Sequence, residues 1–474
     1  MEVHIRLDGR RNLSAGIYRQ LRQAIIDGVL RPGEALPPTR QLAARLSVSR
    51  NTVGVAYDRL ASEGYITAQV GAGTYVSFRA PRAPQRSGNS RHPGVLRPQP
   101  HWSSVELPSL LPARQYNFRT GAPDGSLFPY AAWRGLVTRE LRSIASRGNG
   151  YGDTAGHRGL REAIARHIAI SRGIQASPDD LTITTGTQQA LDLVARVLLA
   201  PGDRVAVENP GYLPAIQLLH SLGAKVVRVP VDEEGLVVDA LPKSARLVYV
   251  TPSHQYPLGV TMSMRRRETL LSWANRTGSA IVEDDYDSEF RFDGRPLDPV
   301  HALDTAGRVV YIGTFSKTML PALRLGFVLV PPALREAVHK AKHVTDWHTN
   351  TLIQGALARF IDDGEYARHL RKLNRLYLTR RDRILEILER DFADVLEPLP
   401  SIAGMHVAAL SKAMSFAELD AVLARALEQG VQLHSLSRYP VDRGDRPGLV
   451  LGYGAIATED IAEGLRRLRA AFDA

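Results

Sequence analysis

Two hydrophobic patterns follow one another along this chain, and they predict two kinds of structure. Over the first sixty or so residues, apolar side chains recur at helical spacing. From about residue 115 onward, short runs rich in β-branched residues alternate with longer helical stretches. The first pattern predicts a small helical domain, and the second predicts an α/β domain built on a parallel sheet.

Three short helices are predicted in the first domain. The first spans 14–27 and ends before Pro32, and the second begins at Thr39, which we expect to act as its cap. The third runs from 50 to 63 with Ser49 as its cap, and its inner face is formed by Val53, Ala56, Tyr57 and Leu60. Two short helices joined by a tight turn predict a helix-turn-helix, whose second helix presents polar side chains to the major groove.

A pair of strands is predicted directly after these helices. Residues 64–67 and 73–77 alternate apolar and polar side chains around the turn Val70-Gly71-Ala72-Gly73. The sequence therefore predicts a hairpin that forms a wing beside the helices.

The larger domain is predicted to hold a doubly wound parallel sheet. Its helical stretches include 187–199 and 265–276. The expected strands are 181–184, 204–207, 225–229, 247–250, 280–283 and 309–312. In such a sheet, ligands bind at the carboxyl ends of the strands.

Composition sets limits on the location and chemistry of the protein. The chain has 474 residues, 44% of them hydrophobic, which is enough for two or three domains with ample cores. It has no cysteine, so it can form no disulfide or thiolate zinc site, and we expect no metal site. Neither a membrane span nor a signal-peptide core is evident, so we expect a cytoplasmic protein.

Positive charge is concentrated near the N-terminus. Residues 1–114 hold 16 arginines, no lysine and 7 acidic residues, for a net charge of +9, whereas the remaining residues contribute +2 to the total of +11. A local excess of this kind favours a polyanionic partner. Within it, 79–100 holds five prolines and five arginines without an acid, which is typical of an extended linker.

The run from Leu36 to Val76, LPPTRQLAARLSVSRNTVGVAYDRLASEGYITAQVGAGTYV, gives the first domain a family resemblance. Residues 12–78 resemble the winged helix-turn-helix of the GntR family. The resemblance implies double-stranded promoter DNA as a partner. It also implies backbone or guanine contacts from Arg40 and Arg50, a place over the groove for Asn51 and Thr52, and a hairpin tip, Gly71 to Gly73, near the minor groove.

The larger domain carries the groups that pyridoxal phosphate (PLP) requires. Lys317 offers an amine for a Schiff base, Asp284 an acid for the pyridinium nitrogen, and Arg324 a cation for the phosphate. The run from 185 to 189 opens a helix after a strand, where free backbone amides favour a phosphate. Asp284, Lys317 and the run 185–189 each follow a different predicted strand, so we expect them to meet at one edge of the sheet.

These motifs resemble the fold-type I aminotransferases, and the whole chain resembles the MocR-type regulators. The 33-residue interval between Asp284 and Lys317, together with Arg324-Leu325-Gly326, is the most specific part of the match. The resemblance implies that Lys317 forms an aldimine, that Asp284, rather than Asp285, pairs with the ring nitrogen, and that Tyr286 donates to the ring oxygen. It further implies a stacking role for Tyr212, and a phosphate site made by Gly186, Thr187, Thr314, Arg324 and Tyr151, the last from the partner in a homodimer.

Two positions depart from the aminotransferase pattern. Tyr256 stands before Pro257 where aminotransferases have an asparagine, and MocR-type sequences share an aromatic residue there. Val450 stands where the arginine for a substrate carboxylate is usual. Arg438 and Arg446 are the nearby candidates for binding an effector.

Three segments and two functions are therefore predicted. The segments are a winged helix-turn-helix domain over 1–78, a basic linker over 79–114 and an aminotransferase-like domain over 115–474. The favoured function is a transcriptional regulator that binds DNA and senses PLP or an amine or amino-acid effector at Lys317. The alternative is a catalytically active PLP-dependent aminotransferase.

Overall fold

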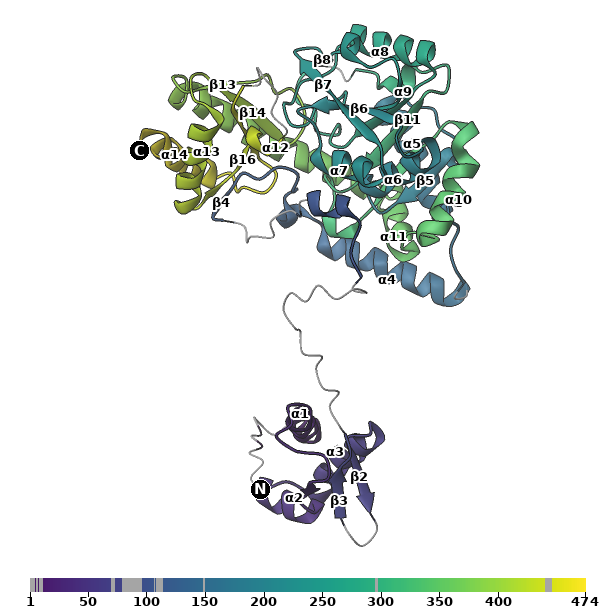
Figure 1. Cartoon of the computed structure of the whole chain (residues 1–474), viewed down its shortest axis with the longest axis vertical. Helices are drawn as coiled ribbons and strands as arrows, with labels where there is room; N and C mark the ends of the chain where they lie inside the picture. Colours follow the sequence, from purple (N-terminus) through teal and green to yellow (C-terminus); the bar gives the residue numbers. More distant parts are fainter. Residues whose placement is uncertain are drawn as a thin grey trace. The chain divides into compact units, whose positions relative to one another are not determined.

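The structure is a computed structural model that describes residues 5, 7, 12–69, 73–78, 96–105, 107, 114–147, 150–294, 297–439 and 446–474. The chain divides into two compact units, Met1–Arg97 and Pro98–Ala474 (Figure 1). No helix within the described ranges is long and apolar enough to cross a membrane. The predicted boundaries at residues 78 and 114 stay predictions, since 79–95 and 108–113 lie outside those ranges.

The first unit is a three-helix domain with a small antiparallel sheet. Its elements are α1 (Leu13–Ile26), β1 (Ala35–Leu36), α2 (Thr39–Leu46), α3 (Arg50–Ser62), β2 (Ile66–Gln69) and β3 (Gly73–Val76). The predicted helices and hairpin are confirmed. The sheet has one strand that the sequence did not predict, because the two residues of β1 are too few to show a pattern, and the order is β1-β3-β2.

Local capping fixes the start of α3. Ser49 Oγ accepts a hydrogen bond of 3.1 Å from the amide of Thr52, as the predicted cap requires. The expected cap of α2 was wrong: Thr39 is the first helical residue, and Pro38 holds the cap position without a side-chain hydrogen bond. The inner face of α3 is buried in the unit's core, as predicted, in a cluster that contains Val53, Ala56, Tyr57 and Leu60.

The second unit is built on an eight-stranded sheet of order β5-β12-β11-β10-β9-β6-β7-β8. The strands are β5 (Leu181–Thr184), β6 (Arg204–Asn209), β7 (Lys225–Asp232), β8 (Gly235–Leu236), β9 (Ala245–Val250), β10 (Ala280–Asp285), β11 (Val309–Thr314) and β12 (Gly326–Leu329). The predicted strands are confirmed, but the sheet is not wholly parallel. β12 runs antiparallel to both β11 and β5, and β8 runs antiparallel to β7. Only residues 315–325 join β11 to β12, which is too short a segment for a helical crossover between parallel strands.

Helices cover both faces of this sheet (Figure 1). One face packs against α6 (Thr187–Leu198), α7 (Leu213–Ser221) and α10 (Arg335–Asp346). The opposite face packs against α4 (Tyr130–Arg147), α5 (Arg158–Arg172), α8 (Met264–Thr277), α9 (Val300–Leu303) and α11 (Thr351–Asp362). Alternate residues of β11 point to the two faces, with Val310 and Ile312 on the first and Val309 and Tyr311 on the second.

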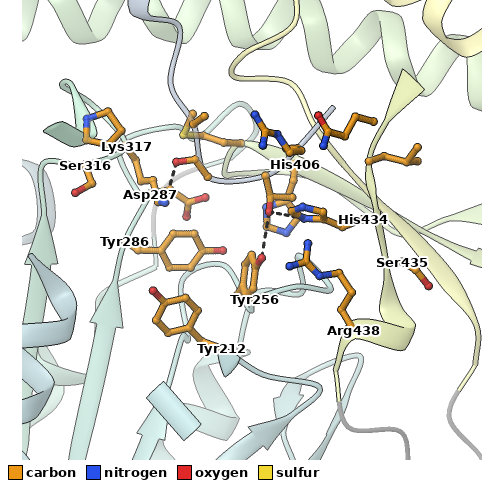
Figure 2. Close-up of a pocket in the computed structure, with 18 of the residues that line it drawn as sticks. Tyr212, Tyr256, Tyr286, Asp287, Ser316, Lys317, His406, His434, Ser435 and Arg438 are labelled. Carbon is orange, nitrogen blue, oxygen red and sulfur yellow. Dashed lines mark hydrogen bonds between the residues drawn. The ribbon is translucent and has the colours of Figure 1, made fainter. Parts of the chain in front are cut away.

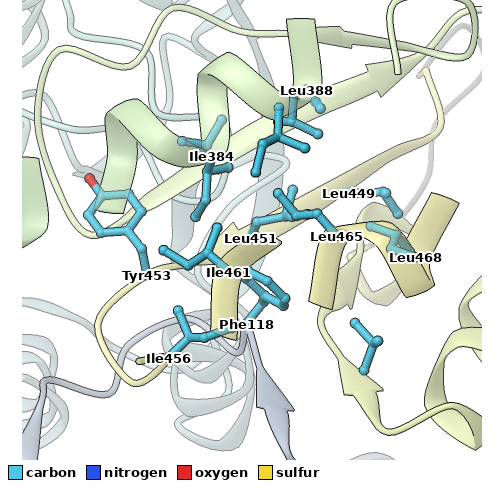
Figure 3. Close-up of a cluster of buried hydrophobic side chains, with 14 of the residues drawn as sticks. Phe118, Ile384, Leu388, Leu449, Leu451, Tyr453, Ile456, Ile461, Leu465 and Leu468 are labelled. Carbon is cyan, nitrogen blue, oxygen red and sulfur yellow. The ribbon is translucent and has the colours of Figure 1, made fainter. Parts of the chain in front are cut away.

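A second sheet lies in the C-terminal part of this unit. Its order is β13 (Leu396–Pro398), β14 (His406–Ser411), β17 (Gly448–Gly452) and β16 (His434–Ser435), and it packs with α12 (Glu365–Asp391), α13 (Phe416–Glu428) and α14 (Asp460–Asp473). β4 (Tyr116–Asn117) pairs with β15 (Val431–Gln432), which ties the start of the unit to this region. Figure 3 shows the apolar core between β17, α12 and α14.

Candidate functional site

A cavity of about 1070 Å³ lies where the carboxyl ends of the large sheet's strands face the smaller sheet. Residues that follow β6, β10 and β11 line one side, and residues of β14, α13 and the segment 431–438 line the other. It holds most of the residues that the sequence singled out for chemistry. They are Thr187, Tyr212, Asp284, Tyr286, Thr314, Lys317, Arg324 and Arg438.

Lys317 lies in the connection just after β11. Its Nζ donates a hydrogen bond of 3.0 Å to the carbonyl of Gly121. Burial lowers the pKa of the Lys317 ammonium, while the nearby carboxylates of Asp287 and Asp284 oppose that shift. A lowered pKa raises the share of neutral amine, which is the form that attacks a carbonyl.

Asp284 lies near the end of β10 with its two oxygens in different situations. Oδ2 accepts a hydrogen bond of 2.5 Å from the hydroxyl of Tyr249. Oδ1 is buried and has no hydrogen-bond partner among the described residues. Burial raises the pKa of the Asp284 carboxyl to about 7, with a smaller contribution from Asp285, while the Tyr249 hydrogen bond and Lys317 counteract it. An orphaned carboxylate oxygen at a cavity is a site for a cationic donor.

An anion cradle lies at the N-terminal end of α6. Gly186 precedes that helix with a φ of +87°, and an added Cβ there would come within 3.0 Å of Nη2 of Arg324. Arg324 itself has a left-handed φ of 50° and donates to the carbonyl of Thr185 at 2.8 Å. Thr314 Oγ1 accepts from the amide of Ser316 at 3.1 Å. A guanidinium beside free amides at a helix N-terminus is suited to a phosphate.

Three tyrosines contribute aromatic surface to the cavity. The ring of Tyr256 lies edge-on to that of Tyr212 at 5.9 Å and to that of Tyr286 at 6.1 Å. The hydroxyl of Tyr286 lies 3.0 Å from Nδ1 of His254, which also contacts Asp287. Tyr212 and Tyr286 therefore offer a ring face and a hydroxyl in the same cavity.

The end of the cavity formed by the smaller sheet carries positive charge. Figure 2 shows Arg438 and His434 on that side, across from Lys317 and Asp287. Burial, followed by the charges of Arg438 and Arg119, lowers the pKa of His434 to about 4. At neutral pH the imidazole is thus uncharged and the two guanidinium groups supply the charge, which suits an anionic group.

Of the residues predicted to bind the cofactor or the effector, Gly186 borders the cavity beside Arg324, whereas Arg446 and Tyr151 are not among the residues that line it. Arg446 is exposed and forms an ion pair of 2.7 Å with Glu397. Tyr151 is 81% exposed, and its ring lies 4.6 Å from that of Trp347. The structure thus brings Arg438, but not Arg446, to the site. Tyr151 lies outside the cavity of its own chain, and its role in a partner's site stays a prediction.

The predicted DNA contacts gather on the surface of the first unit. Arg40 at the start of α2, Arg50 and Asn51 at the start of α3, and Gly73 at the start of β3 are exposed. The hydroxyl of Thr52 lies 2.8 Å from Ser49 Oγ, so it takes part in capping the helix. Gly71 lies outside the described residues.

Sequence reasoning missed several residues of the cavity. Tyr249 reads as an ordinary member of a buried strand, and only the pairing of β9 with β10 brings it beside Asp284. Arg119, His406 and His434 come from segments without a motif. Asp287 could have been predicted from the sequence, since it belongs to the same acidic run as Asp284.

Comparison with known proteins gives this arrangement a family. Residues 13–76 match the bacterial regulatory proteins of the gntR family, and residues 114–442 match aminotransferase class I and II. The probable rhizopine catabolism regulatory protein MocR of Rhizobium meliloti is 39% identical over 96% of this chain and 93% of its own length. The chain belongs to the MocR-type regulators of the gntR family.

Two further relatives match the whole chain and the larger domain, respectively. The pyridoxine biosynthesis transcriptional regulator PdxR of Corynebacterium glutamicum is 32% identical over 93% of this chain and 91% of its own length. The crystal structure of Pyrococcus horikoshii kynurenine aminotransferase matches with a TM-score of 0.69 and 32% identity, over 75% of this chain and 90% of that one. The predicted fold class, a winged helix-turn-helix with a fold-type I aminotransferase-like domain, is confirmed.

The aminotransferase class I and II family is PLP-dependent, and the cavity fits that cofactor. It offers an amine at Lys317, a buried carboxylate with one oxygen open at Asp284, and a cation at a helix N-terminus at Arg324. These are the three kinds of group that PLP requires of a protein.

Proposed function

We propose that this MocR-type regulator binds promoter DNA through its winged helix and binds PLP in the large cavity, where the cofactor or an amine effector changes DNA occupancy. The observation that carries the proposal is the convergence of Lys317, Asp284 and Arg324 on one cavity of a chain that also has a DNA-reading module. Allostery of this kind requires the ligand to have different affinities for two states of the protein.

Each group of the cavity has one task toward the cofactor. PLP supplies an aldehyde for Lys317 and a ring that withdraws electrons when its nitrogen is protonated. Oδ1 of Asp284 would accept the hydrogen bond of that nitrogen, and Tyr249 would hold the carboxylate in place. Tyr212 would stack on the ring and Tyr286 would donate to its oxygen.

The phosphate would bind at the start of α6. Gly186 and Thr187 would contribute backbone amides, Arg324 its guanidinium and Thr314 its hydroxyl. Tyr151 of a second copy would complete the site, because its exposed ring lies outside the cavity of its own chain. The functional unit would then be a homodimer with two DNA-reading heads and two half-sites.

The effector would be a small amine or amino acid with an anionic end. Its amine would approach Lys317, while Arg438 and Arg119 would attract a carboxylate or sulfonate at the opposite end of the cavity. This proposal follows from the positive charge at that end of the cavity. Burial and the two arginines lower the pKa of His434 to about 4, so the imidazole is uncharged at neutral pH and the charge belongs to Arg438 and Arg119.

The DNA contacts would come from three places in the first unit. Arg50 and Asn51 would read base edges from the start of α3, and Thr52 would support them through the cap. Arg40 would contact the phosphate backbone, and Gly71 and Gly73 would bring the hairpin tip to the minor groove.

A working aminotransferase is the second candidate function. It is favoured by the match to a kynurenine aminotransferase at 32% identity, since the same cavity could bind a substrate. Steady turnover of an amino donor and a keto acid, lost in Lys317→Ala, would support it.

Two assays on the same protein separate these functions. Selection from a random pool of duplexes tests for a preferred DNA sequence, and a coupled assay with PLP, amino donors and keto acids tests for turnover. We expect a selected sequence that depends on Arg50, with at most a single half-reaction. Steady turnover without any selected sequence would overturn the proposal.

A further inference from the structure

The recognition helix α3 carries an apolar side chain on the face that is turned away from the core. Val53, Ala56, Tyr57 and Leu60 are buried, whereas Val55 is 50% exposed and belongs to no apolar cluster of the described residues. A single exposed valine is common on protein surfaces. Val55 differs from such a residue because it lies on the exposed face of the helix that is expected to enter the major groove.

Val55 lies one helical turn after Asn51, on the same face of α3. Arg50, Asn51 and Val55 are all exposed, and they occupy the first two turns of the helix. These are the turns that enter the major groove in a helix-turn-helix. A duplex that contacts Arg50 and Asn51 therefore also meets Val55.

Gly54 leaves room for close approach beside Val55. A Cβ added at Gly54 would have no neighbour within 4 Å in the described part of the chain, so the helix surface is open at that point. Glycine inside a helix is destabilising relative to alanine, and no packing against the described part of this unit accounts for it at this position. The smooth Gly54-Val55 surface suits a flat neighbour better than a long polar side chain would.

The chemistry of the major groove identifies what an apolar side chain can read there. Among the four base pairs, the C5-methyl group of thymine is the apolar group that the groove presents, and the other edges offer hydrogen-bond donors and acceptors. Asp58 follows one turn later on the same exposed side, and its carboxylate is repelled by the phosphates. Among the exposed positions 50, 51, 55 and 58 of α3, Val55 is thus the one with an apolar side chain.

We propose that Val55, with Gly54 beside it, reads the 5-methyl group of a thymine in each half-site. Four residues of helix span about 6 Å, so this thymine lies about two base pairs from the base that Asn51 contacts. Asn51 pairs best with adenine, through N6 and N7. The inference rests on the proposed function, and it adds a requirement for one methyl group at one position of the half-site.

The test replaces thymine by deoxyuridine, which removes the methyl group and keeps every hydrogen-bonding atom. A duplex is first selected with the full-length protein, and each thymine is then replaced singly. At one thymine per half-site we expect uracil to weaken binding of the native protein by about fourfold, as burial of one methyl-sized group predicts. Val55→Ala should bind the thymine duplex about as weakly as the native protein binds the uracil duplex, and should be insensitive to the replacement.

A matched control and two contrary outcomes complete the design. Val29 is 66% exposed and lies outside α3, so Val29→Ala should keep the native sensitivity to uracil. The inference would be overturned if the native protein bound the uracil and thymine duplexes equally at every position, or if Val55→Ala kept the full sensitivity to uracil. In either case the protein would still select a DNA sequence, so the proposed function would stand. Failure to select any sequence, with no effect of Arg50→Ala, would instead contradict the proposed function.

Discussion

Tyr249 donates a hydrogen bond of 2.5 Å to Oδ2 of Asp284, and Oδ1 of the same carboxylate is left buried without a partner among the described residues. The tyrosine fixes the orientation of the acid, so that the open oxygen meets whatever enters the cavity. A buried, unpaired carboxylate destabilises a folded protein. It is an arrangement suited to binding a protonated ring nitrogen.

Asp284→Asn should weaken PLP binding and stabilise the cofactor-free protein. Loss of a hydrogen bond to a charged group corresponds to roughly 1.5–3 kcal/mol, or at least a tenfold loss of affinity for PLP. A spectrophotometric titration of the bound cofactor measures this change.

The stability change should depend on pH. Burial raises the pKa of the Asp284 carboxyl to about 7 from an ordinary value of 3.8. The folded state therefore holds a proton that the unfolded state releases, and stability falls as pH rises from about 4 to about 7 and stays low above that. Asn cannot ionise, so the variant's advantage should grow over this range to a few kcal/mol (~1.4 per pKa unit).

Thermal unfolding of the cofactor-free proteins at pH 4 and pH 8 measures this effect. Asp239→Asn is the control, since Asp239 is exposed. If Asp284→Asn shifted the melting temperature equally at both pH values, ionisation of the Asp284 carboxyl could not be the cause of the change in stability.

Gly186→Ala should disturb the anion cradle. The added Cβ would press on Nη2 of Arg324 at 3.0 Å, and the φ of +87° would strain any side chain. Gly202 has a φ of +97°, but a Cβ there would meet no neighbour within 4 Å in the described ranges. Both variants should lose about 1 kcal/mol of stability. Only Gly186→Ala should lose affinity for PLP, and its affinity for pyridoxal, which lacks the phosphate, should change little. If Gly186→Ala lost equal affinity for PLP and for pyridoxal, the phosphate would not bind at this position.

Tyr151 and Lys317 should complement one another across a dimer. In a heterodimer of Tyr151→Ala and Lys317→Ala chains, one site combines the intact Lys317 of one chain with the intact Tyr151 of the other. We expect tight PLP binding at half of the sites of the heterodimer, once it is separated from the two homodimers, and weak binding in either homodimer. Absorbance titration of the purified heterodimer of the two co-expressed chains measures the fraction. No recovery in the heterodimer would contradict a shared site.

Arg438 and Arg446 offer a matched pair for the effector. Arg438 lines the cavity, whereas Arg446 pairs with Glu397 at the surface. Arg438→Ala should lower the affinity for γ-aminobutyrate by about tenfold, as loss of a charged hydrogen bond predicts. Arg438→Ala should leave the affinity for butylamine unchanged, and Arg446→Ala should change neither affinity. Calorimetric titration of the PLP-bound protein gives both affinities, and an equal loss for the two ligands would place the anionic end elsewhere.

The sequence predicted those parts of the site that depend on local pattern. Lys317, Asp284 and Thr187 follow separate hydrophobic strands, and a sheet brings such positions together whatever the details of packing. It could not predict that Tyr249 would hold Asp284, because that contact depends on the register of β9 against β10. Arg438 and Arg446 are eight residues apart and looked equivalent, since the ion pair with Glu397 forms only when distant strands meet. The sequence analysis predicted no strand over Gly326–Leu329 and expected a wholly parallel sheet, because the four residues of β12 are too few to show a clear pattern.

The central claim is that PLP at Lys317 controls DNA occupancy. A gel-shift titration on the DNA upstream of the protein's own gene, with and without PLP and against a random duplex at matched salt, tests it most directly. We expect specific retention by the native protein whose midpoint shifts with PLP, and specific retention by Lys317→Ala that does not shift. If the native protein and Lys317→Ala both retained the specific duplex with the same midpoint in the presence and absence of PLP, the claim would be contradicted.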